Sequence, residues 1–113
     1  MKVTITSIKL RGPFKLFILS SEAMKIMKQL KATNCKGFKK TGWWTKQYTM
    51  TLWDSEDELK EFARTGAHLD AMKLSKKIST EIQTITINRQ ALLKWKEAKK
   101  ILSSEGKTIR FEN

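Results

Sequence analysis

The sequence predicts an α+β protein in which one antiparallel sheet carries helices on one face. Residues 2–10, 48–53 and 80–88 alternate apolar and polar side chains or are rich in threonine and isoleucine, as strands are. Stretches with apolar residues at helical spacing lie between and after them. The chain contains no low-complexity linker and no internal repeat, so we expect residues 1–113 to form a single domain.

The first strand, predicted over residues 2–10, contains a change of phase. Val3 and Ile5 share one face, whereas Ile8 and Leu10 share the other. One inserted residue would produce this change, so we expect a bulge near Thr6 and Ser7.

The next elements are predicted to be a helix and a hairpin. A short apolar connector at residues 14–19 precedes Ser20 and Ser21, either of which can cap a helix. A second strand over residues 34–40 and a turn then lead antiparallel into residues 48–53.

A capping-box pattern marks the start of the following helix. Ser55 is followed three residues later by Glu58, and Phe62 belongs to the buried stripe. Gly66 is expected to end or kink this helix, after which helical spacing continues to Ile78.

The last part of the chain predicts a further helix and a short strand. Asn88 is expected to cap the helix, and residues 107–111 form the strand. The buried stripe of the helix is predicted to contain Ala91, Trp95, Ala98 and Leu102.

The predicted order is β-α-β-β-α-β-α-β, and its first six elements have the ferredoxin-like arrangement. Helices on one face leave the other sheet face bare, and apolar residues such as Tyr48, Met50 and Leu52 would make that face unstable in water. We therefore expect a homodimer in which two sheets meet face to face. The extra C-terminal helix and short strand would clamp the partner.

The formal charge of +12 is compatible with three kinds of partner: nucleic acid, an anionic surface or an acidic small ligand. It is equally compatible with a solvated, lysine-rich surface. Sequence-specific nucleic-acid recognition relies mostly on arginine. Because only four of the 23 basic residues are arginine, nucleic acid is disfavoured.

The single Cys35 excludes an internal disulfide and is typical of a reducing compartment, so we expect a cytoplasmic protein. No apolar run reaches the roughly 20 residues that a membrane span needs, and no membrane partner is expected. No His, Cys or carboxylate residues have the spacing of metal ligands, so no metal site is predicted.

Trp53 and His68 are the main candidates for a functional site. Trp53 shares its strand face with Thr49 and Thr51, and a large ring beside hydroxyl groups is typical of a pocket wall. The alternative is a core tryptophan that covers the helix. His68 is the only imidazole in the chain and could carry a proton or bind haem iron. The alternative is a histidine held at the edge of the helix–sheet packing.

A second group of candidates surrounds the predicted hairpin turn. Trp43 and Trp44 lie among basic residues, and basic and aromatic residues together are what a single-stranded nucleic-acid platform needs. The alternative places both tryptophans at a pocket mouth or a dimer seam. The basic residues in question are Lys36, Lys39, Lys40 and Lys46.

The stretch YTMTLWDSEDELKEFARTGAHLDAM resembles the strand–helix core of the dimeric α/β-barrel superfamily. That group includes the antibiotic-biosynthesis monooxygenases, the haem-degrading monooxygenases and the spheroidene-monooxygenase-like proteins. The common pattern is a strand ending in Trp, an acidic or Ser-containing helix start, a Phe in the helix, and a His followed by a small residue and Met. Here these are Trp53, Asp54-Ser55-Glu56, Phe62, and His68 with Ala71-Met72.

The resemblance implies a monooxygenase-like enzyme acting on a flat hydrophobic or haem-like ligand in a cleft between sheet and helices, with haem or no cofactor. The catalytic candidates are His68 and Trp53. The ligand site is expected to contain Thr49, Thr51, Trp53, Phe62, Met72, Trp43 and Trp44. The alternative function is a non-catalytic binding module for an acidic partner or single-stranded nucleic acid, with Lys39, Lys40, Trp43, Trp44 and Lys46 as its site.

Overall fold

The computed structural model describes residues 1–33, 35–64 and 66–111, without the side chains of Trp43, Lys76 and residues 67–71. The strands are β1 (Lys2–Leu10), β2 (Gly37–Trp43), β3 (Lys46–Trp53), β4 (Ser79–Asn88) and β5 (Lys107–Arg110). The helices are α1 (Lys15–Lys31), α2 (Glu56–Ala63), α3 (Gly66–Ile78) and α4 (Trp95–Glu105).

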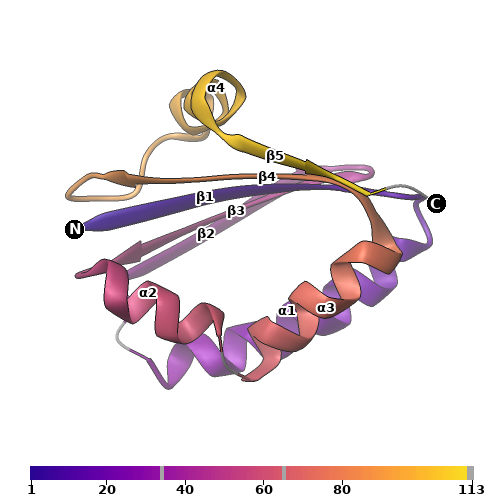
Figure 1. Cartoon of the computed structure of the whole chain (residues 1–113), viewed down its shortest axis with the longest axis horizontal. Coiled ribbons are helices and arrows are strands. Elements are labelled where there is room, and N and C mark those ends of the chain that lie inside the picture. The colour runs from indigo at the N-terminus through magenta and orange to yellow at the C-terminus, as the bar shows by residue number, and fades with distance from the viewer. Residues whose placement is uncertain (34, 65, 112–113) are drawn as a thin grey trace.

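The strands form one antiparallel sheet in the order β2-β3-β1-β4-β5, with β1 in the centre. Helices α1, α2 and α3 lie on one face of this sheet, and α4 lies on the other (Figure 1). The predicted α+β class and the ferredoxin-like arrangement are confirmed. The predicted break at Gly66 is confirmed: α2 ends at Ala63, and α3 begins at Gly66, whose φ is positive at 59°.

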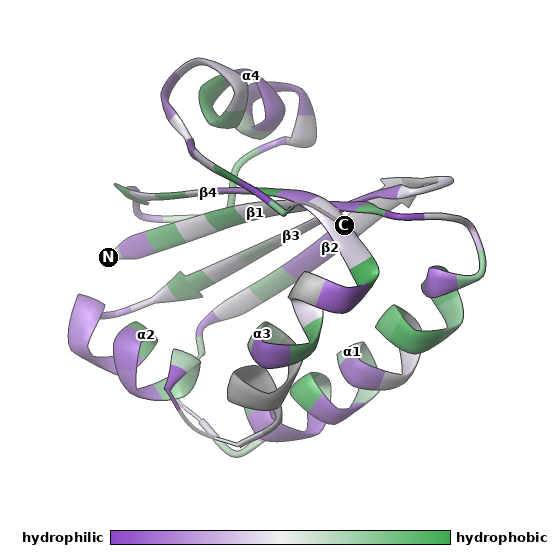
Figure 2. Ribbon diagram, turned by 45° about the vertical axis from the view of Figure 1, so that its right-hand side comes forward, coloured by the Kyte–Doolittle hydropathy of each residue, from purple (hydrophilic) through white to green (hydrophobic). Residues whose placement is uncertain are grey.

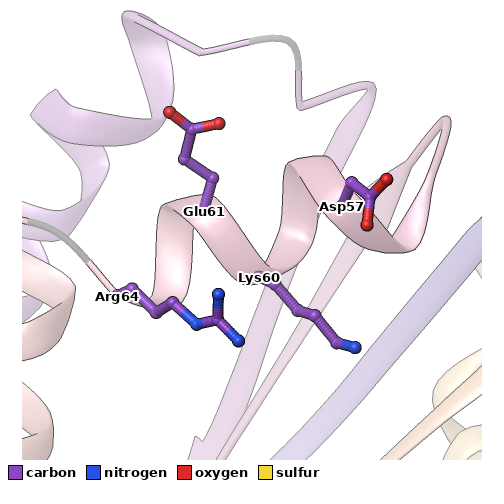
Figure 3. Close-up of a pocket in the computed structure, with 4 residues that line it drawn as sticks. All are labelled: Asp57, Lys60, Glu61 and Arg64. Atoms are coloured by element: carbon purple, nitrogen blue, oxygen red, sulfur yellow. The ribbon is translucent and has the colours of Figure 1, made fainter.

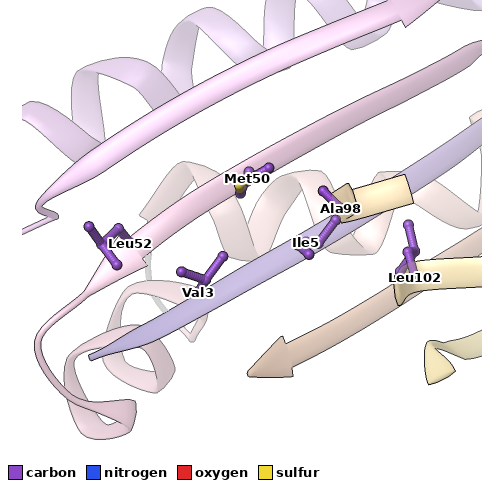
Figure 4. Close-up of a cluster of buried hydrophobic side chains, with 6 residues drawn as sticks. All are labelled: Val3, Ile5, Met50, Leu52, Ala98 and Leu102. Atoms are coloured by element: carbon purple, nitrogen blue, oxygen red, sulfur yellow. The ribbon is translucent and has the colours of Figure 1, made fainter. Parts of the chain in front are cut away.

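The apolar face of the sheet is closed by α4 of the same chain. Val3 and Ile5 of β1 and Met50 and Leu52 of β3 are buried against Ala98 and Leu102 of α4 (Figure 4). Leu92 and Leu93, in the connector that precedes α4, add to this core. The expectation of a bare sheet face was therefore wrong, because the helix expected to clamp a partner packs on its own sheet.

The expected bulge in the middle of β1 is also absent from the described pairing. Burial alternates regularly from Lys2 to Ser7, and the register against β4 shifts only between Lys9 and Leu10. The change of phase in the sequence arises because Ser7 takes a fully buried position on the apolar face. Ile8 then falls on the opposite face.

Local signals predicted some helix ends and missed others. The hydroxyl oxygen of Ser55 accepts a hydrogen bond from the backbone N–H of Glu58 at 3.3 Å, which confirms the predicted cap. Helix α1, in contrast, begins at Lys15, before the expected serine caps and without a side-chain cap. Asn88 ends β4 rather than capping a helix, and α4 begins only at Trp95.

The apolar stretch at residues 14–19, predicted to be a connector, forms the beginning of α1 from Lys15 onward (Figure 2). Among the described residues, no helix has the length and apolar character needed to cross a bilayer.

Candidate functional site

Threonines cover the middle of the sheet face on which α1, α2 and α3 lie. The register pairs Thr4 with Thr51 and Thr86, and it pairs Thr6 with Thr49 and Thr84. Residues directly opposite each other in an antiparallel sheet point to the same side. The side chains therefore form two rows across β3, β1 and β4, which we call the threonine face: Thr4, Thr6, Thr49, Thr51, Thr84 and Thr86.

Two pairs of hydroxyl groups on the threonine face are hydrogen-bonded to each other. The Oγ1 atoms of Thr4 and Thr86 are 2.9 Å apart, and those of Thr6 and Thr84 are 3.2 Å apart. One hydroxyl of each pair donates and the other accepts, so the accepting group keeps its own hydrogen for another partner. Each pair can therefore donate a hydrogen bond to a ligand or to water.

The helices cover the threonine face incompletely. Thr49 and Thr86 are exposed, and the other four threonines are half-buried. Apolar packing from the helices is concentrated at one end, where Leu30 of α1 and Phe62 of α2 are buried with Trp53. One threonine at the outer end of each row, Thr86 in one and Thr49 in the other, is thus accessible from solvent.

The electrostatics of this sheet face favour an anionic or electron-rich ligand. Lys2 of β1 lies opposite Trp53, and the exposed Lys40 of β2 lies opposite Thr49. In the register of the described strands, the acidic residue of the sheet, Glu81, pairs with Lys9 and lies on the other face. The charged residues that the described strands place on the threonine face are therefore basic, whereas the acidic residues on this side belong to α2.

Trp53 is a core residue at the end of the threonine face. Its side chain is 1% exposed, and its Nε1–H donates to Thr51 Oγ1 at 2.9 Å. The centre of its ring lies 5.2 Å from the ring centre of Phe62. The ring is thus enclosed by protein, as in the core alternative. Trp53 borders the threonine face through its hydrogen bond to Thr51 and not as an open wall.

The other expected site residues are placed as follows. Phe62 is buried, and Met72 of α3 is exposed. His68 belongs to the first turn of α3, but its side chain lies outside the described residues, as does that of Trp43.

The Gln29 side chain links α1 to the end of α2 and the start of α3. The Gln29 amide donates to the carbonyl oxygen of Phe62 at 3.2 Å, and the Gln29 side chain would lie 3.2 Å from a Cβ at Gly66. The start of α3 is therefore held near the Trp53–Phe62 core.

The lysines of the alternative binding module do not form one surface. Lys39 donates to the backbone oxygen of Leu93 at 2.9 Å on the α4 side of the sheet, whereas Lys40 points to the threonine face. The Nζ atom of Lys46 lies 5.7 Å from the ring centre of Tyr48. A continuous nucleic-acid strip along β2 is not supported by these positions.

A shallow hollow on α2 is lined by Asp57, Lys60, Glu61 and Arg64 (Figure 3). These residues recur at helical spacing on one exposed helix face, and they carry both signs of charge. Their arrangement is that of a solvated helix surface. No cluster of three or more His, Cys, Asp or Glu residues that could hold a metal occurs in the part of the chain that the structure describes.

The sequence contains a signal for the complete threonine face. A threonine–apolar–threonine triplet occurs at residues 4–6, 49–51 and 84–86. Only the triplet at 49–51 was assigned to a site. Recognising the complete face requires knowing that β3 and β4 both flank β1, which is a property of the tertiary fold.

No family model matches the sequence, and no curated protein matches it either. Solved structures do resemble the fold. A crystal structure of an antibiotic biosynthesis monooxygenase superposes with a TM-score of 0.69 at 9% identity, covering 80% of this chain and 100% of that one. Rv0793 from Mycobacterium tuberculosis gives a TM-score of 0.70 at 10% identity, with 83% and 100% covered.

A third similar structure is SnoaB, a cofactor-independent oxygenase from Streptomyces nogalater. Its TM-score is 0.62 at 10% identity, and the superposition covers 81% of this chain and 95% of that one. At identities this low the likeness concerns the fold alone. The chain has the ferredoxin-like fold seen in structures of antibiotic biosynthesis monooxygenases.

Proposed function

We propose that this protein is a small monooxygenase-like enzyme that binds a flat, hydrophobic ligand with oxygen substituents over the threonine face. The observation that carries the proposal is the pair of threonine rows, which offers hydroxyl donors on an incompletely covered sheet face. Lys2 and Lys40 at its border favour phenolate or enolate oxygens. The fold shared with structures named as monooxygenases supports the choice of reaction.

The chemistry that suits such a face is direct oxygenation of an electron-rich ring system. A proton leaves an activated methylene group next to a ring carbonyl, and the resulting enolate is stabilised by hydroxyl donors on its oxygen. The enolate then reacts with O2. One oxygen atom becomes the new ring carbonyl and the other leaves as water, so the methylene carbon is oxidised and O2 is reduced.

The proton acceptor in this proposal is His68, because histidine changes its protonation state near neutral pH. Trp53 acts as a positioning residue, because its indole N–H orients the Thr51 hydroxyl. Phe62 supports Trp53 through ring contact, and Met72 and Thr49 would meet the ligand from α3 and β3.

Haem is a weaker candidate for the ligand or cofactor. The Trp53 ring is enclosed and bound to Thr51 and Phe62, so it offers no open surface on which a porphyrin could stack. Titration with haemin tests this directly. We expect no sharp Soret band in the wild type, and therefore no difference between the wild type and His68→Ala.

The proposal includes a cytoplasmic homodimer. Because α4 occupies the apolar face, a second copy would pack on the outer surface of α4 or on the edge strand β5, whose residues are all exposed. Light scattering over a range of protein concentrations tests this arrangement.

The test of the function uses 1,8-dihydroxyanthrone, a flat tricyclic compound with an activated methylene group. O2 consumption and formation of the anthraquinone are measured for the wild type, Thr6→Val and Thr49→Val. The matched control is Thr41→Val, since Thr41 pairs with Tyr48 on the other face of the sheet. The proposal expects losses of about fivefold or more at Thr6 and Thr49, the equivalent of one hydrogen bond, and none at Thr41. Equal rates in all four proteins, or no turnover above the uncatalysed rate, would reject it.

The alternative of a binding module for single-stranded nucleic acid has less support, because its lysines are divided between the two sheet faces. Affinity for a labelled oligonucleotide at low and at physiological salt would measure it.

A further inference from the structure

One end of the molecule carries a group of exposed aromatic rings, which we call the aromatic end: Phe14, Phe17 and Trp44. Their side chains are 81%, 76% and 65% exposed. Leu16 and Ile18, also in the first turns of α1, are exposed as well. Large apolar groups that gather at one place on a surface usually mark an interaction site.

The rings come from segments that are distant in the sequence but meet at one end of the sheet. The N–H of Leu10, which ends β1, donates to the carbonyl oxygen of Thr45 in the β2–β3 turn at 2.8 Å. The N–H of Arg11 donates to the carbonyl oxygen of Ile78 at the end of α3, at 2.9 Å. The start of α1, the β2–β3 turn and the end of α3 therefore lie together (Figure 1).

Helical geometry explains why Phe14 and Phe17 point outward. Residues three apart lie on the same side of a helix, and the inward side of α1 is already defined by the buried Leu30 and the half-buried Ile26. Trp44 is exposed because it occupies the tight β2–β3 turn, where its φ is +56°. The sequence thus places all three rings in water by local geometry.

Positive charge surrounds these rings. The basic residues at this end of the strands and helices are Lys9, Arg11, Lys15, Lys46, Lys77 and Arg110. Glu81, which lies among them, is paired with Arg110 at 3.3 Å. The opposite end, where β3 leads into α2, carries both signs of charge: the acidic Asp54, Glu56, Asp57, Glu58 and Glu61 occur there with the basic Lys2, Lys36, Lys60 and Arg64. The aromatic end therefore has the more one-sided positive charge and is the positive pole of the molecule.

We propose that the aromatic end binds the surface of an anionic lipid bilayer. Aromatic and aliphatic side chains insert into the headgroup region, while neighbouring lysines and arginines attract anionic headgroups. Such a contact requires no membrane-spanning helix. It assigns a partner to the net charge of +12, for which the sequence alone left several partners open.

A second copy of the chain fits this surface less well. Two copies meeting at their aromatic ends would bring two positive poles together, and like charges at close range oppose association. Nucleic acid would satisfy the charges but not the aliphatic side chains of Leu16 and Ile18, which lie beside the rings.

The experiment measures cosedimentation of the full chain with phosphatidylcholine vesicles, with and without phosphatidylserine, at low and at physiological salt. Phe14→Ser/Phe17→Ser tests the rings, and Met24→Ser is its control. Met24 is exposed on the same outward side of α1 but lies about 15 Å further along the helix. Lys15→Glu tests the local charge, and Lys96→Glu in the first turn of α4 changes the net charge equally. A carboxylate is favourable in the first turn of a helix, so neither charge variant should harm the fold.

The proposal expects binding that requires phosphatidylserine. The double phenylalanine variant should bind about tenfold or more weakly, and Lys15→Glu about fivefold or more weakly. Met24→Ser and Lys96→Glu should bind like the wild type. The proposal is overturned by absence of binding at low salt, by equal binding to neutral vesicles, or by equal losses in the control variants. It is also overturned if the phenylalanine variant binds vesicles like the wild type but differs from it in molar mass by light scattering. That result would assign the surface to a second copy.

Discussion

The indole N–H of Trp53 donates a hydrogen bond to the hydroxyl oxygen of Thr51 at 2.9 Å, and this contact joins the core under α2 to the threonine face. Both residues lie on β3, two positions apart, on the same side of the sheet. The enclosed ring therefore orients a hydroxyl group of the proposed ligand site without being exposed itself.

The Trp53–Thr51 contact should contribute measurably to stability. Thr51→Val leaves a buried indole donor without its partner, which costs about 1–3 kcal/mol. Urea unfolding of Thr51→Val, Trp53→Phe and the double variant measures the coupling between the two residues. We expect the double variant to be less destabilised than the sum of the single variants. Additive effects would contradict the contact, and Trp44→Phe at an exposed position is the control for a tryptophan replacement.

Helix α4 should stabilise the chain to which it belongs. Leu102 is 1% exposed in the core with Val3 and Ile5, so Leu102→Ala should cost about 2–5 kcal/mol. The exposed Lys100 on the same helix provides the control, and Lys100→Ala should change stability by less than about 0.5 kcal/mol. The measurement is urea unfolding at two protein concentrations. A cost that depends on concentration would show that α4 packs on a partner instead.

Gly66 should tolerate no side chain, because the backbone there has a φ of +59°. A Cβ at this position would also lie 3.2 Å from the side chain of Gln29. Gly66→Ala should destabilise the protein by about 1–2 kcal/mol. Gly12→Ala is the matched control, since a Cβ there meets nothing within 4 Å. Thermal unfolding compares the two variants, and equal midpoints would contradict the described break between α2 and α3.

The hydroxyl pair of Thr6 and Thr84 should matter for ligand binding more than for folding. Valine favours strands, so Thr6→Val should leave the unfolding free energy within about 1 kcal/mol of the wild type. Affinity for 1,8-dihydroxyanthraquinone should fall about fivefold for the loss of one hydrogen bond. Fluorescence titration gives the affinity. A stability loss without an affinity loss would assign the pair a structural role only.

Local signals predicted those parts of the fold that local interactions determine. Ser55 caps α2 as expected, because its hydroxyl needs only a partner three residues away. Asn88 misled the prediction for the opposite reason. It pairs with Lys2 as the last residue of the β4 ladder, and this non-local contact takes precedence over its tendency to cap a helix.

The position of α4 and the composition of the threonine face were not predictable from local signals. An apolar stripe containing Ala98 and Leu102 fits the chain's own sheet and a partner's sheet equally well, and the sequence does not distinguish them. The threonine triplets were visible, but they become one surface only because β1 lies between β3 and β4.

The most direct test of the account is an NMR titration of methyl-labelled threonines with 1,8-dihydroxyanthraquinone. The account predicts that the methyl signals of Thr4, Thr6, Thr49 and Thr84 shift, while those of Thr41 and Thr108 on the other face of the sheet stay unchanged. Shifts confined to Thr41 and Thr108, or no shifts at saturating ligand, would contradict the claim that the threonine face is the ligand site.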